Sequence, residues 1–250
     1  MSQLVNNTSF SVKRLSSVIV AGQDVLSQRL NVIANALSNT GTNGFKNVFL
    51  KTKEIERSSP DGTRVSYPTI EGTTYDFSQG GIKTTGEQTH VALMGQGFFK
   101  VKTLAGIKYS RNGEFAINAN NQLIDGTGNL ILSDSDSPIA FPENTKSILI
   151  DSKGFVSANG NTIGKLGVVQ FKDDQLLKAC GNSFFDSNQE EMPSEAMVSQ
   201  GVLELSNVCS VQELVNMMEV EQRFMNLQKA LDEYDKNIKR TISADKGNQV

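Results

Sequence analysis

The stretch from Ser210 to Ile242 places the strongest constraint on the fold of this chain, because it contains neither glycine nor proline. It predicts a single helix about 48 Å long, longer than most helices inside a compact domain. A first apolar stripe recurs at spacings of three and four: Met217, Val220, Phe224, Leu227, Leu231, Tyr234 and Ile238. A second, offset stripe comprises Val211, Leu214, Val215, Met218 and Met225. So broad a face, on a seven-residue repeat, predicts packing against more than one neighbouring helix.

The N-terminal region has the same character. Apolar residues fall at helical spacing from residue 15 onward, at Leu15, Ile19, Leu26, Leu30, Ile33 and Leu37. Gly22 is a potential breaker within this segment, and the run Asn39-Thr-Gly-Thr-Asn-Gly44 ends the predicted helix. Neither terminal helix has a fold of its own, so each must bury its apolar face against the other or against other chains.

The middle of the chain follows a different pattern. Residues 80–181 contain 14 of the 21 glycines, and short β-rich runs alternate there with turn residues. The predicted strands are 98–101, 130–132, 147–150 and 167–171, and the predicted turns are Asn112-Gly113, Asp125-Gly126 and Asn159-Gly160. The expected fold class is therefore α+β. Helices from the two termini pair as a coiled-coil-like layer, and a central all-β domain lies between them in the sequence.

This pattern divides the chain into four parts. Residues 1–46 are the N-terminal helical part of an inner domain, and residues 47–80 form an extended linker or hairpin, broken at Ser58-Ser-Pro-Asp-Gly62. Residues 81–203 form the central β domain, and residues 204–250 are the C-terminal helical part of the inner domain. Head-to-tail contacts that do not close produce helical filaments. The pattern alone favours such an assembly no more strongly than an ordinary long core helix.

Composition excludes several classes of function. The net charge of −3, from 24 basic and 27 acidic residues, gives no electrostatic footprint for nucleic acid or an anionic membrane. The longest aliphatic run, Val18-Ile-Val-Ala21, is too short to span a bilayer, and no cleavage site of small residues follows it. The two cysteines, Cys180 and Cys209, allow one disulfide at most, and two unpaired thiols are expected.

No catalytic or metal-binding pattern is recognisable. The single histidine, His90, leaves no multi-histidine metal site and indicates a structural role at a strand edge. Gly95-Gln-Gly97 and Gly126-Thr-Gly128 lack the third glycine of a dinucleotide fingerprint. Asn118-Ala-Asn120 and Asp134-Ser-Asp136 lack the glycine of a calcium loop. We therefore expect no enzyme activity, catalytic residue, metal ligand, cofactor, small-molecule substrate or nucleic-acid partner.

Three motifs, in order along the chain, resemble those of the axial proteins of the bacterial flagellum, the rod and hook family. The first, Ala34-Asn-Ala-Leu-Ser-Asn-Thr-Gly-Thr-Asn-Gly-Phe-Lys46, resembles Ala-Asn-Asn-Leu-Ala-Asn-x-x-Thr-x-Gly-Phe-Lys. The second consists of Gly95-Gln-Gly-Phe-Phe99 and Tyr109-Ser-Arg-Asn-Gly-Glu-Phe115, and the third runs from Glu204 to Phe224. The third motif departs at Cys209, where an Asn or Asp is usual.

The resemblance implies a structural subunit of the flagellar basal-body rod. Its terminal helices would form the inner coiled-coil layer of a helical tube, part of the drive shaft and export conduit, with the β domain outside. It also implies export through the flagellar type III apparatus without a cleaved signal peptide, and assembly in the periplasmic space with other rod proteins and copies of itself. Chain length and the diverged first motif favour the proximal-rod over the distal-rod type.

Two other classes of protein remain open at this point. One is a periplasmic or surface adhesion module, whose β domain binds a ligand while its helices only dimerise. The other is an enzyme with an unrecognised site in the β domain. A concave pocket with convergent polar groups would favour either alternative. Contacts along both terminal helices would favour the filament.

Two sets of candidate site residues follow. The expected assembly interface comprises Ile19, Leu26, Leu30, Ile33, Leu37, Val211, Leu214, Val215, Met218, Phe224, Leu227, Leu231 and Ile238. The family-motif positions are Asn35, Asn39, Thr42, Gly44, Phe45, Lys46, Gly95, Gly97, Phe98, Phe99, Ser206, Asn207 and Val208. The resemblance implies that the first of these shape the turn that leaves the first helix. Gly44 is expected at positive φ, with Phe45 anchoring the segment that follows.

Overall fold

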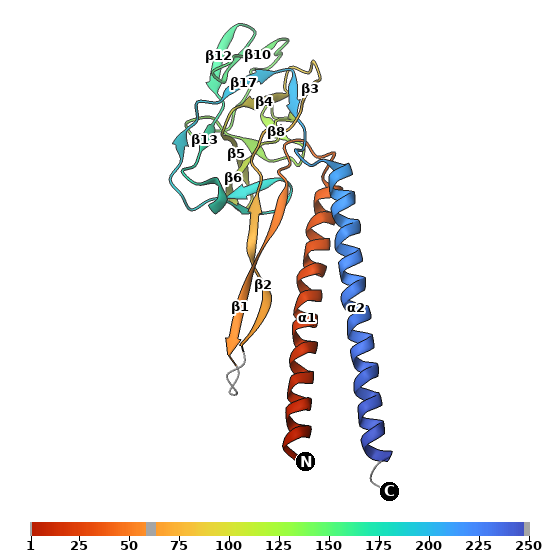
Figure 1. Ribbon diagram of the computed structural model, residues 1–250. Helices are drawn as coiled ribbons and strands as arrows, with labels where there is room; N and C mark the ends of the chain where they lie inside the picture. Colours follow the sequence, from red (N-terminus) through yellow and green to blue (C-terminus); the bar gives the residue numbers. More distant parts are fainter. Residues whose placement is uncertain (1, 59–63, 248–250) are drawn as a thin grey trace. The chain divides into compact units, whose positions relative to one another are not determined.

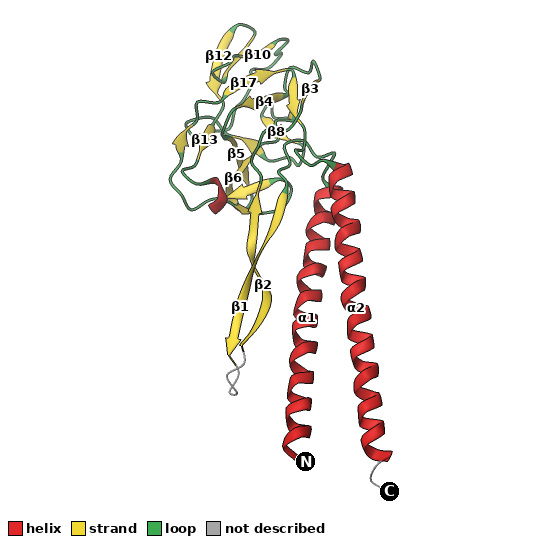
Figure 2. Ribbon diagram, in the orientation of Figure 1, coloured by secondary structure: helices red, strands yellow, loops and turns green. Residues whose placement is uncertain are grey.

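The computed structural model describes the backbone of residues 2–58 and 64–247, and the side chains of residues 16–58 and 64–240. Within these ranges the chain has one long helix at each end and a β-rich region between them, so the α+β class is confirmed (Figure 2). Two compact units are present. The helical unit comprises Met1–Leu37, Val48–Thr74 and Ser210–Val250, and the β unit comprises Ser38–Asn47 and Tyr75–Cys209.

These units differ from the predicted parts at several boundaries. The β unit includes residues 38–46, expected with the N-terminal helix, residues 47 and 75–80, expected with the linker, and residues 204–209, expected with the C-terminal helix. Residues 48–74, expected as a separate linker or hairpin, belong to the helical unit, and the predicted break at Ser59–Gly62 lies outside the described residues. The first difference has a physical cause, because Gly44 and Lys46 are buried among β-unit residues.

The helical unit contains α1 (Ser2–Ser38) and α2 (Ser210–Gly247), which lie side by side within it (Figure 1). A Cβ added to Gly22 would lie 3.2 Å from Leu227 Cδ1, so this glycine lets the other helix approach closely and does not break α1. Both helices are longer than predicted, because the spacing of apolar residues detects only the turns that need a packing partner. The described parts of these helices contain no segment apolar enough, over a sufficient length, to cross a membrane.

The helical unit also contains most of a two-stranded sheet, formed by β1 (Val48–Ser58) and β2 (Arg64–Tyr75). Most side chains of β1 are exposed. Cross-strand ion pairs join Lys51 to Glu71 at 3.0 Å and Arg64 to Glu56 at 3.8 Å, with all four side chains largely in solvent. Such exposed pairs contribute little to stability, about 0–1 kcal/mol each.

The β unit consists of short antiparallel strands. They are β3 (Ile82–Thr84), β4 (Val91–Met94), β5 (Phe98–Thr103), β6 (Gly106–Ser110), β7 (Phe115–Ile117), β8 (Leu123–Asp125), β9 (Leu130–Ile131), β10 (Ile148–Ile150), β11 (Phe155–Ala158), β12 (Asn161–Lys165), β13 (Val168–Gln170), β14 (Lys178–Ala179), β15 (Phe184–Asp186), β16 (Met192–Pro193), β17 (Met197–Gln200) and β18 (Val202–Glu204), with the 3-10 turn η1 (Asp174–Leu176) before β14. The largest sheet of the described residues has the order β14-β15-β6-β5-β9-β8-β7, and β13 joins β5 to β16. Smaller sheets have the orders β10-β11-β12, β17-β4 and β18-β3. The four predicted strands correspond to β5, β9, β10 and β13.

The three predicted turns differ in mechanism. Asn159 and Gly160 have φ values of 50° and 85° and join β11 to β12, as an Asn-Gly hairpin turn requires. The turn after β8 is held by the Asp125 side chain, whose Oδ1 accepts from Thr127 N at 2.9 Å and Asn129 N at 2.8 Å. Gly113 is needed for another reason, because an added Cβ would clash with the Val91 carbonyl.

The core of the β unit is organised by the alternation of β5. Phe99 joins the larger apolar cluster and lies 5.1 Å from the ring of Phe115. Phe98 belongs to a smaller aromatic cluster with Phe171 and Phe185. Successive side chains of a strand point to opposite faces, so the Phe-Phe pair of the second motif supplies one ring to each cluster.

Candidate functional site

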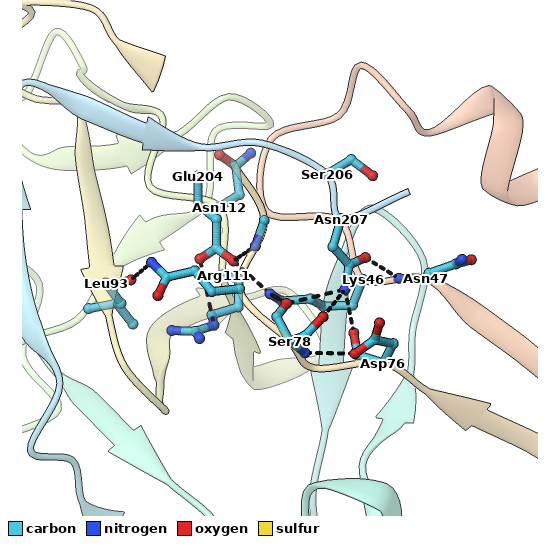
Figure 3. Close-up of polar contacts among 12 residues, drawn as sticks. Lys46, Asn47, Asp76, Ser78, Leu93, Arg111, Asn112, Glu204, Ser206 and Asn207 are labelled. Carbon is cyan, nitrogen blue, oxygen red and sulfur yellow. Dashed lines mark hydrogen bonds and ion pairs between the residues drawn. The ribbon is translucent and has the colours of Figure 1, made fainter. Parts of the chain in front are cut away.

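A buried ion pair links the first family motif to the third. Lys46 Nζ lies 2.6 Å from Glu204 Oε1, and neither side chain is exposed to solvent (Figure 3). Lys46 Nζ also donates to the Ser78 carbonyl at 2.7 Å, and the Gly80 N–H donates to Glu204 Oε1 at 3.1 Å. Buried charges are tolerated when they are paired and hydrogen-bonded. These contacts meet that requirement for the ammonium and for one carboxylate oxygen.

Arg111, from the second motif, lies beside the Lys46–Glu204 ion pair. Its Nε lies 3.8 Å from Glu204 Oε2, its Nη2 donates to the Gly95 carbonyl at 2.7 Å, and its guanidinium lies 5.8 Å from the Phe98 ring centroid. Lys46, Arg111 and Glu204 thus place two positive charges and one negative charge together in this buried site. Burial lowers the pKa of Lys46 and the pKa of Arg111, and the negative charge of Glu204 opposes both shifts.

Gly44 allows the first motif to run directly over the second. Its φ of 68° confirms the predicted left-handed conformation, and its N–H donates to the Glu204 carbonyl at 2.7 Å. A Cβ at this position would lie 2.5 Å from both Arg111 C and Asn112 N. Real Cβ atoms do not approach backbone so closely, so two independent constraints demand glycine here. The sequence indicated only the first of them.

Asn207 ties three chain segments together with one side chain. Its Oδ1 accepts from Asn47 N at 2.7 Å, and its Nδ2 donates to the Asp76 carbonyl at 2.8 Å and the Ser78 carbonyl at 3.2 Å. The Asp76 N–H in turn donates to the Asn47 carbonyl at 2.9 Å. This arrangement uses both ends of the amide, which explains an asparagine at this motif position.

The structure brings many of the motif positions together around this ion pair. Gly44, Lys46 and Asn207 contribute directly, Gly95 accepts from Arg111, and Thr42 Oγ1 donates to Asn39 Oδ1 at 3.1 Å in the turn before them. The remaining positions lie around this centre or in the core of the β unit: Phe45, Gly97, Phe98, Phe99, Ser206 and Val208. Asn35 lies on α1, in the helical unit, with its side chain exposed.

Sequence reasoning missed two charged residues of this site, Glu204, which pairs with Lys46, and Arg111, which pairs with Glu204. Glu204 and Arg111 both lie within the motifs, but neither was predicted to be buried. One signal was available, because Glu204 interrupts the apolar run Val202-Leu-Glu-Leu205, and a charge in such a run needs a partner. Nothing in the sequence indicated that this partner would be Lys46.

The predicted assembly residues fall into two groups. Those of the first α2 stripe and of α1 are half-buried or buried in this chain: Ile19, Leu26, Leu30, Ile33, Leu37, Phe224, Leu227, Leu231 and Ile238. Those of the second stripe are exposed: Val211 at 69%, Leu214 at 49%, Val215 at 40% and Met218 at 60%. Met225, on the same stripe, is 46% exposed. The sequence treated both stripes as one broad face, and the structure separates them.

A second charged cluster lies within the β unit. Lys100 Nζ is paired with Asp136 and lies 2.6 Å from Glu191 Oε2, and Tyr109 Oη donates to Glu191 Oε1 at 2.6 Å. Burial and the hydrogen bond to Glu191 raise the pKa of Tyr109. All these groups are engaged with one another, so the cluster braces the loops that carry Asp136 and Glu191 against β5 and β6.

The described residues include no group of three or more His, Cys, Asp or Glu side chains placed to hold a metal ion. His90 Nδ1 lies 3.0 Å from Thr85 Oγ1, beside a bridge between His90 and Glu114, consistent with the expected structural role. Cys180 and Cys209 are unpaired, as expected, and both are exposed. The contacts of Lys46, Glu204 and Asn207 join chain segments that are far apart in the sequence, and in this sense the site is a structural junction.

Comparisons with known proteins agree with this interpretation. Residues 92–158 match the family described as flagellar hook protein FlgE/F/G D1 domain, and residues 199–244 match the family described as flagellar basal body rod FlgEFG protein C-terminal. The first match contains Arg111, and the second contains Glu204 and the exposed stripe of α2. Fold and matches together define the class as a flagellar axial protein.

Three relatives illustrate the similarity. The flagellar basal-body rod protein FlgG of Borreliella burgdorferi is 31% identical, with 86% of this chain and 93% of the relative covered. The flagellar basal-body rod protein FlgF of Caulobacter vibrioides is 28% identical, with 84% and 89% covered. FlgG of Buchnera aphidicola subsp. Schizaphis graminum is 28% identical, with 88% and 95% covered. The chain belongs to the flagellar basal-body rod protein family.

Proposed function

We propose that this chain is a structural subunit of the flagellar basal-body rod, of the proximal FlgF type, and that it has no catalytic role. Its terminal helices assemble it into a helical tube that serves as part of the drive shaft and export conduit. The exposed apolar stripe of α2 carries this proposal. Val211, Leu214, Val215 and Met218 lie on adjacent turns of one helix face, and each is at least 40% exposed. An exposed apolar stripe of this kind marks a site of contact with another protein.

The first stripe of α2 has a different role in this proposal. Its half-buried or buried residues, from Met217 to Ile238, are spaced alternately by three and four, which is the spacing of a coiled-coil seam. We place α1 on this seam in a coiled-coil-like pair, supported by the close approach of Gly22 and Leu227. The second stripe is thereby left for neighbouring subunits, and the two helices form the inner domain of the assembled subunit.

Partners and location follow from the same proposal. Neighbouring subunits are other rod proteins and copies of this chain, in the basal body, across the periplasmic space. The chain reaches them through the flagellar type III export apparatus, without a cleaved signal peptide. The distal FlgG type is the alternative, because FlgG relatives are identical to this chain to a similar extent as the FlgF relative, at 28% and 31% against 28%. An adhesion module would use the exposed stripe only to dimerise, and an enzyme would leave it without a role.

The test is Met218→Asp in the exposed stripe. Burying an unpaired carboxylate at a subunit interface costs several kcal/mol, about 2–5, and the cost recurs at every subunit. Met218 is 60% exposed in the free chain, so the variant folds as the wild type does. We expect basal bodies purified from cells that carry Met218→Asp to lack this subunit, and the cells to be non-motile.

The matched control is Asn226→Asp, which adds the same charge at an exposed position of α2 outside both stripes. Its side chain accepts from Gln222 Nε2 at 3.1 Å, and a carboxylate preserves that contact. Asn226→Asp should leave incorporation and motility intact. Normal motility with Met218→Asp would show that the stripe is not an assembly surface, and the proposal would fail.

A further inference from the structure

The exposed stripe of α2 lies on the side of the helix away from its covered stripe. Met218 precedes the buried Val220 by two residues, so at about 100° per residue the two side chains point in directions about 160° apart. The apolar part of the stripe begins at Val211 and ends at Met225, and Lys229, the next position on the same face, is also exposed. A partner that covers the stripe therefore contacts about the first four turns of α2.

The outward face of α1 carries much shorter side chains. It comprises six exposed positions at spacings of three and four: Val20, Asp24, Ser27, Asn31, Ala34 and Ser38. Asn31 precedes the buried Ile33 by two residues, so this face also lies about 160° around its helix from a covered position. None of the six side chains is longer than that of asparagine, so another helix can approach this face closely.

Large side chains on α2 and short side chains on α1 make complementary surfaces. The chain uses such a contact internally, where Leu227 of α2 lies 3.2 Å from the Cβ position of Gly22 on α1. The distance between packed helices depends on the side chains at their contact, and a large residue set against a short one keeps it small. The outward face of α1 in another copy therefore fits the exposed stripe of α2.

The contact between Gly22 and Leu227 also fixes which residues of the two helices lie at the same level. α1 and α2 run in opposite directions within the helical unit (Figure 1). Asn31 follows Gly22 by nine residues along α1. Met218 precedes Leu227 by nine residues along α2, so it lies at the level of Asn31. By the same count, the other level pairs are Asp24 with Met225, Ala34 with Val215 and Ser38 with Val211.

The charges agree with a neighbouring copy placed at this level. Asp24 is the charged residue of the outward face of α1, and Lys229 lies one turn beyond Met225 on the exposed side of α2. Because Asp24 is level with Met225, a second copy alongside brings Asp24 within reach of Lys229. Exposed pairs of this kind contribute little to affinity, and they favour one register of the two helices over others.

We propose that the exposed stripe of α2 binds the outward face of α1 in a second copy of this chain, with Met218 opposite Asn31. This inference rests on the proposed function and names the occupant of its interface. The two surfaces belong to different helices, so the contact is heterologous, and each copy uses both surfaces to extend the assembly. A twofold pairing of two exposed stripes would close at two copies and would leave the outward face of α1 uncovered.

The test is a disulfide between introduced cysteines in assembled basal bodies. The full-length chain carries Met218→Cys and Asn31→Cys, together with Cys180→Ser and Cys209→Ser to remove its own exposed thiols. A disulfide requires Cβ atoms about 3.5–4.5 Å apart, so only positions that face each other closely react. Mild oxidation of purified basal bodies should convert this chain into covalent dimers and higher oligomers, which a reducing agent returns to monomers.

The matched control carries Arg29→Cys in place of Asn31→Cys. Arg29 is exposed and only two residues from Asn31, but at about 100° per residue it lies about 160° around α1 from it. The control pair should remain monomeric, as should Met218→Cys alone. Dimers formed by Met218→Cys alone would indicate the twofold pairing and would overturn the inference.

An exchange of side-chain size tests the same contact without oxidation. Ala34→Leu enlarges a side chain that is exposed in the free chain and that lies level with Val215. We expect Ala34→Leu to abolish motility by obstructing Val215 of the neighbouring copy, and Val215→Ala in the same chain to restore it. Full motility with Ala34→Leu alone would overturn the inference.

The outcomes separate this inference from the proposed function. Basal bodies that contain the cysteine pair but yield no covalent dimer overturn the inference and leave the proposed function standing. Equal dimer formation with Asn31→Cys and with Arg29→Cys does the same. Absence of the wild-type chain from basal bodies overturns both.

Discussion

Lys46 Nζ and Glu204 Oε1 lie 2.6 Å apart with both side chains fully buried, although 158 residues separate them in the sequence. Removal of one partner leaves the other charge buried without compensation, which typically costs about 3–5 kcal/mol. We therefore expect Lys46→Met to lower the free energy of unfolding of the β unit by about that amount. Urea denaturation monitored by circular dichroism measures the change.

Lys51→Met is the matched control for this prediction. Lys51 pairs with Glu71 at 3.0 Å, but the two side chains are 64% and 40% exposed. Loss of an exposed pair costs about 0–1 kcal/mol. The double variant Lys46→Met/Glu204→Met should cost less than the sum of its single changes, because no unpaired charge remains on this pair. Equal effects of Lys46→Met and Lys51→Met would contradict the importance of the buried pair.

Gly44 should be far more sensitive to substitution than another glycine of positive φ. Gly44→Ala adds strain at φ 68° and brings a Cβ to 2.5 Å from the backbone of Arg111 and Asn112. We expect a loss of more than about 3 kcal/mol in the free energy of unfolding, at the upper end of point-mutation effects. Gly128 has φ 87° with open space around it, so Gly128→Ala should lose only about 1–2 kcal/mol. A similar loss in both variants would show that the close approach is relieved at no cost.

Gly44 and the Lys46–Glu204 pair show how much of the site the sequence alone could predict. Local rules predicted the left-handed glycine, the helix stop before it and the helix start at Ser210, because each depends on neighbouring residues. The pairing of Lys46 with Glu204 depends on the path of the chain between them, and no local pattern encodes that path. For the same reason, the close approach of the Arg111 backbone to Gly44 could not be predicted from the sequence.

The helices also separate what the local sequence predicts from what depends on the tertiary structure. Apolar spacing predicted both stripes of α2, but spacing reports only that a face is apolar. It does not report which stripe is covered within the chain. The structure makes that distinction, with Leu227 half-buried near Gly22 and Met218 60% exposed.

Leu227→Asp should therefore differ from Met218→Asp in the free chain. Leu227 is half-buried within the helical unit, so a carboxylate there should weaken that unit, whereas Met218→Asp should not. Neither change touches the core of the β unit, whose melting temperature should stay at the wild-type value. Limited proteolysis of α1 and α2 in the purified protein measures the first effect, and calorimetry measures the second.

Rod assembly provides the second readout for Leu227→Asp, and we expect loss of motility. Lys229→Asp, at an exposed position of α2, is the control and should be milder. Normal motility with Leu227→Asp would show that pairing on the first stripe is not needed for assembly. The β unit would then become the first candidate for the functional part.

Stability at alkaline pH should depend on Tyr109. Burial, followed by the hydrogen bond to Glu191, raises the pKa of Tyr109 above its ordinary value of 10.0. A group whose pKa is raised on folding contributes stability that is present below the unfolded pKa and is lost as pH rises above it. Between about pH 10 and 11, the wild type should lose up to about 1.4 kcal/mol per pH unit that Tyr109→Phe does not lose. Parallel slopes for the two proteins in urea titrations across this range would contradict the assignment.

Both thiols should react in the native, unreduced protein. Cys180 and Cys209 are unpaired and exposed, so a colourless disulfide reagent such as dithionitrobenzoate reaches each without unfolding. We expect two equivalents of released chromophore per chain before denaturation and no further release after it. The variants Cys180→Ser and Cys209→Ser should each release one equivalent. A rise on denaturation would show that one thiol is covered.

The hydrogen bonds of Asn207 hold together the chain segments that enter and leave the β unit. Asn47, Asp76 and Asn207 each lie next to a point where the chain passes from one unit to the other, and one amide side chain holds all three backbones together. The β unit is in this sense a closed cassette whose ends are already joined. The loop-closure entropy of the cassette depends only weakly on its length. Evolution or a protein engineer can therefore enlarge, shorten or exchange its outer strands while the chain ends that lead to β1, β2 and α2 keep the same spacing.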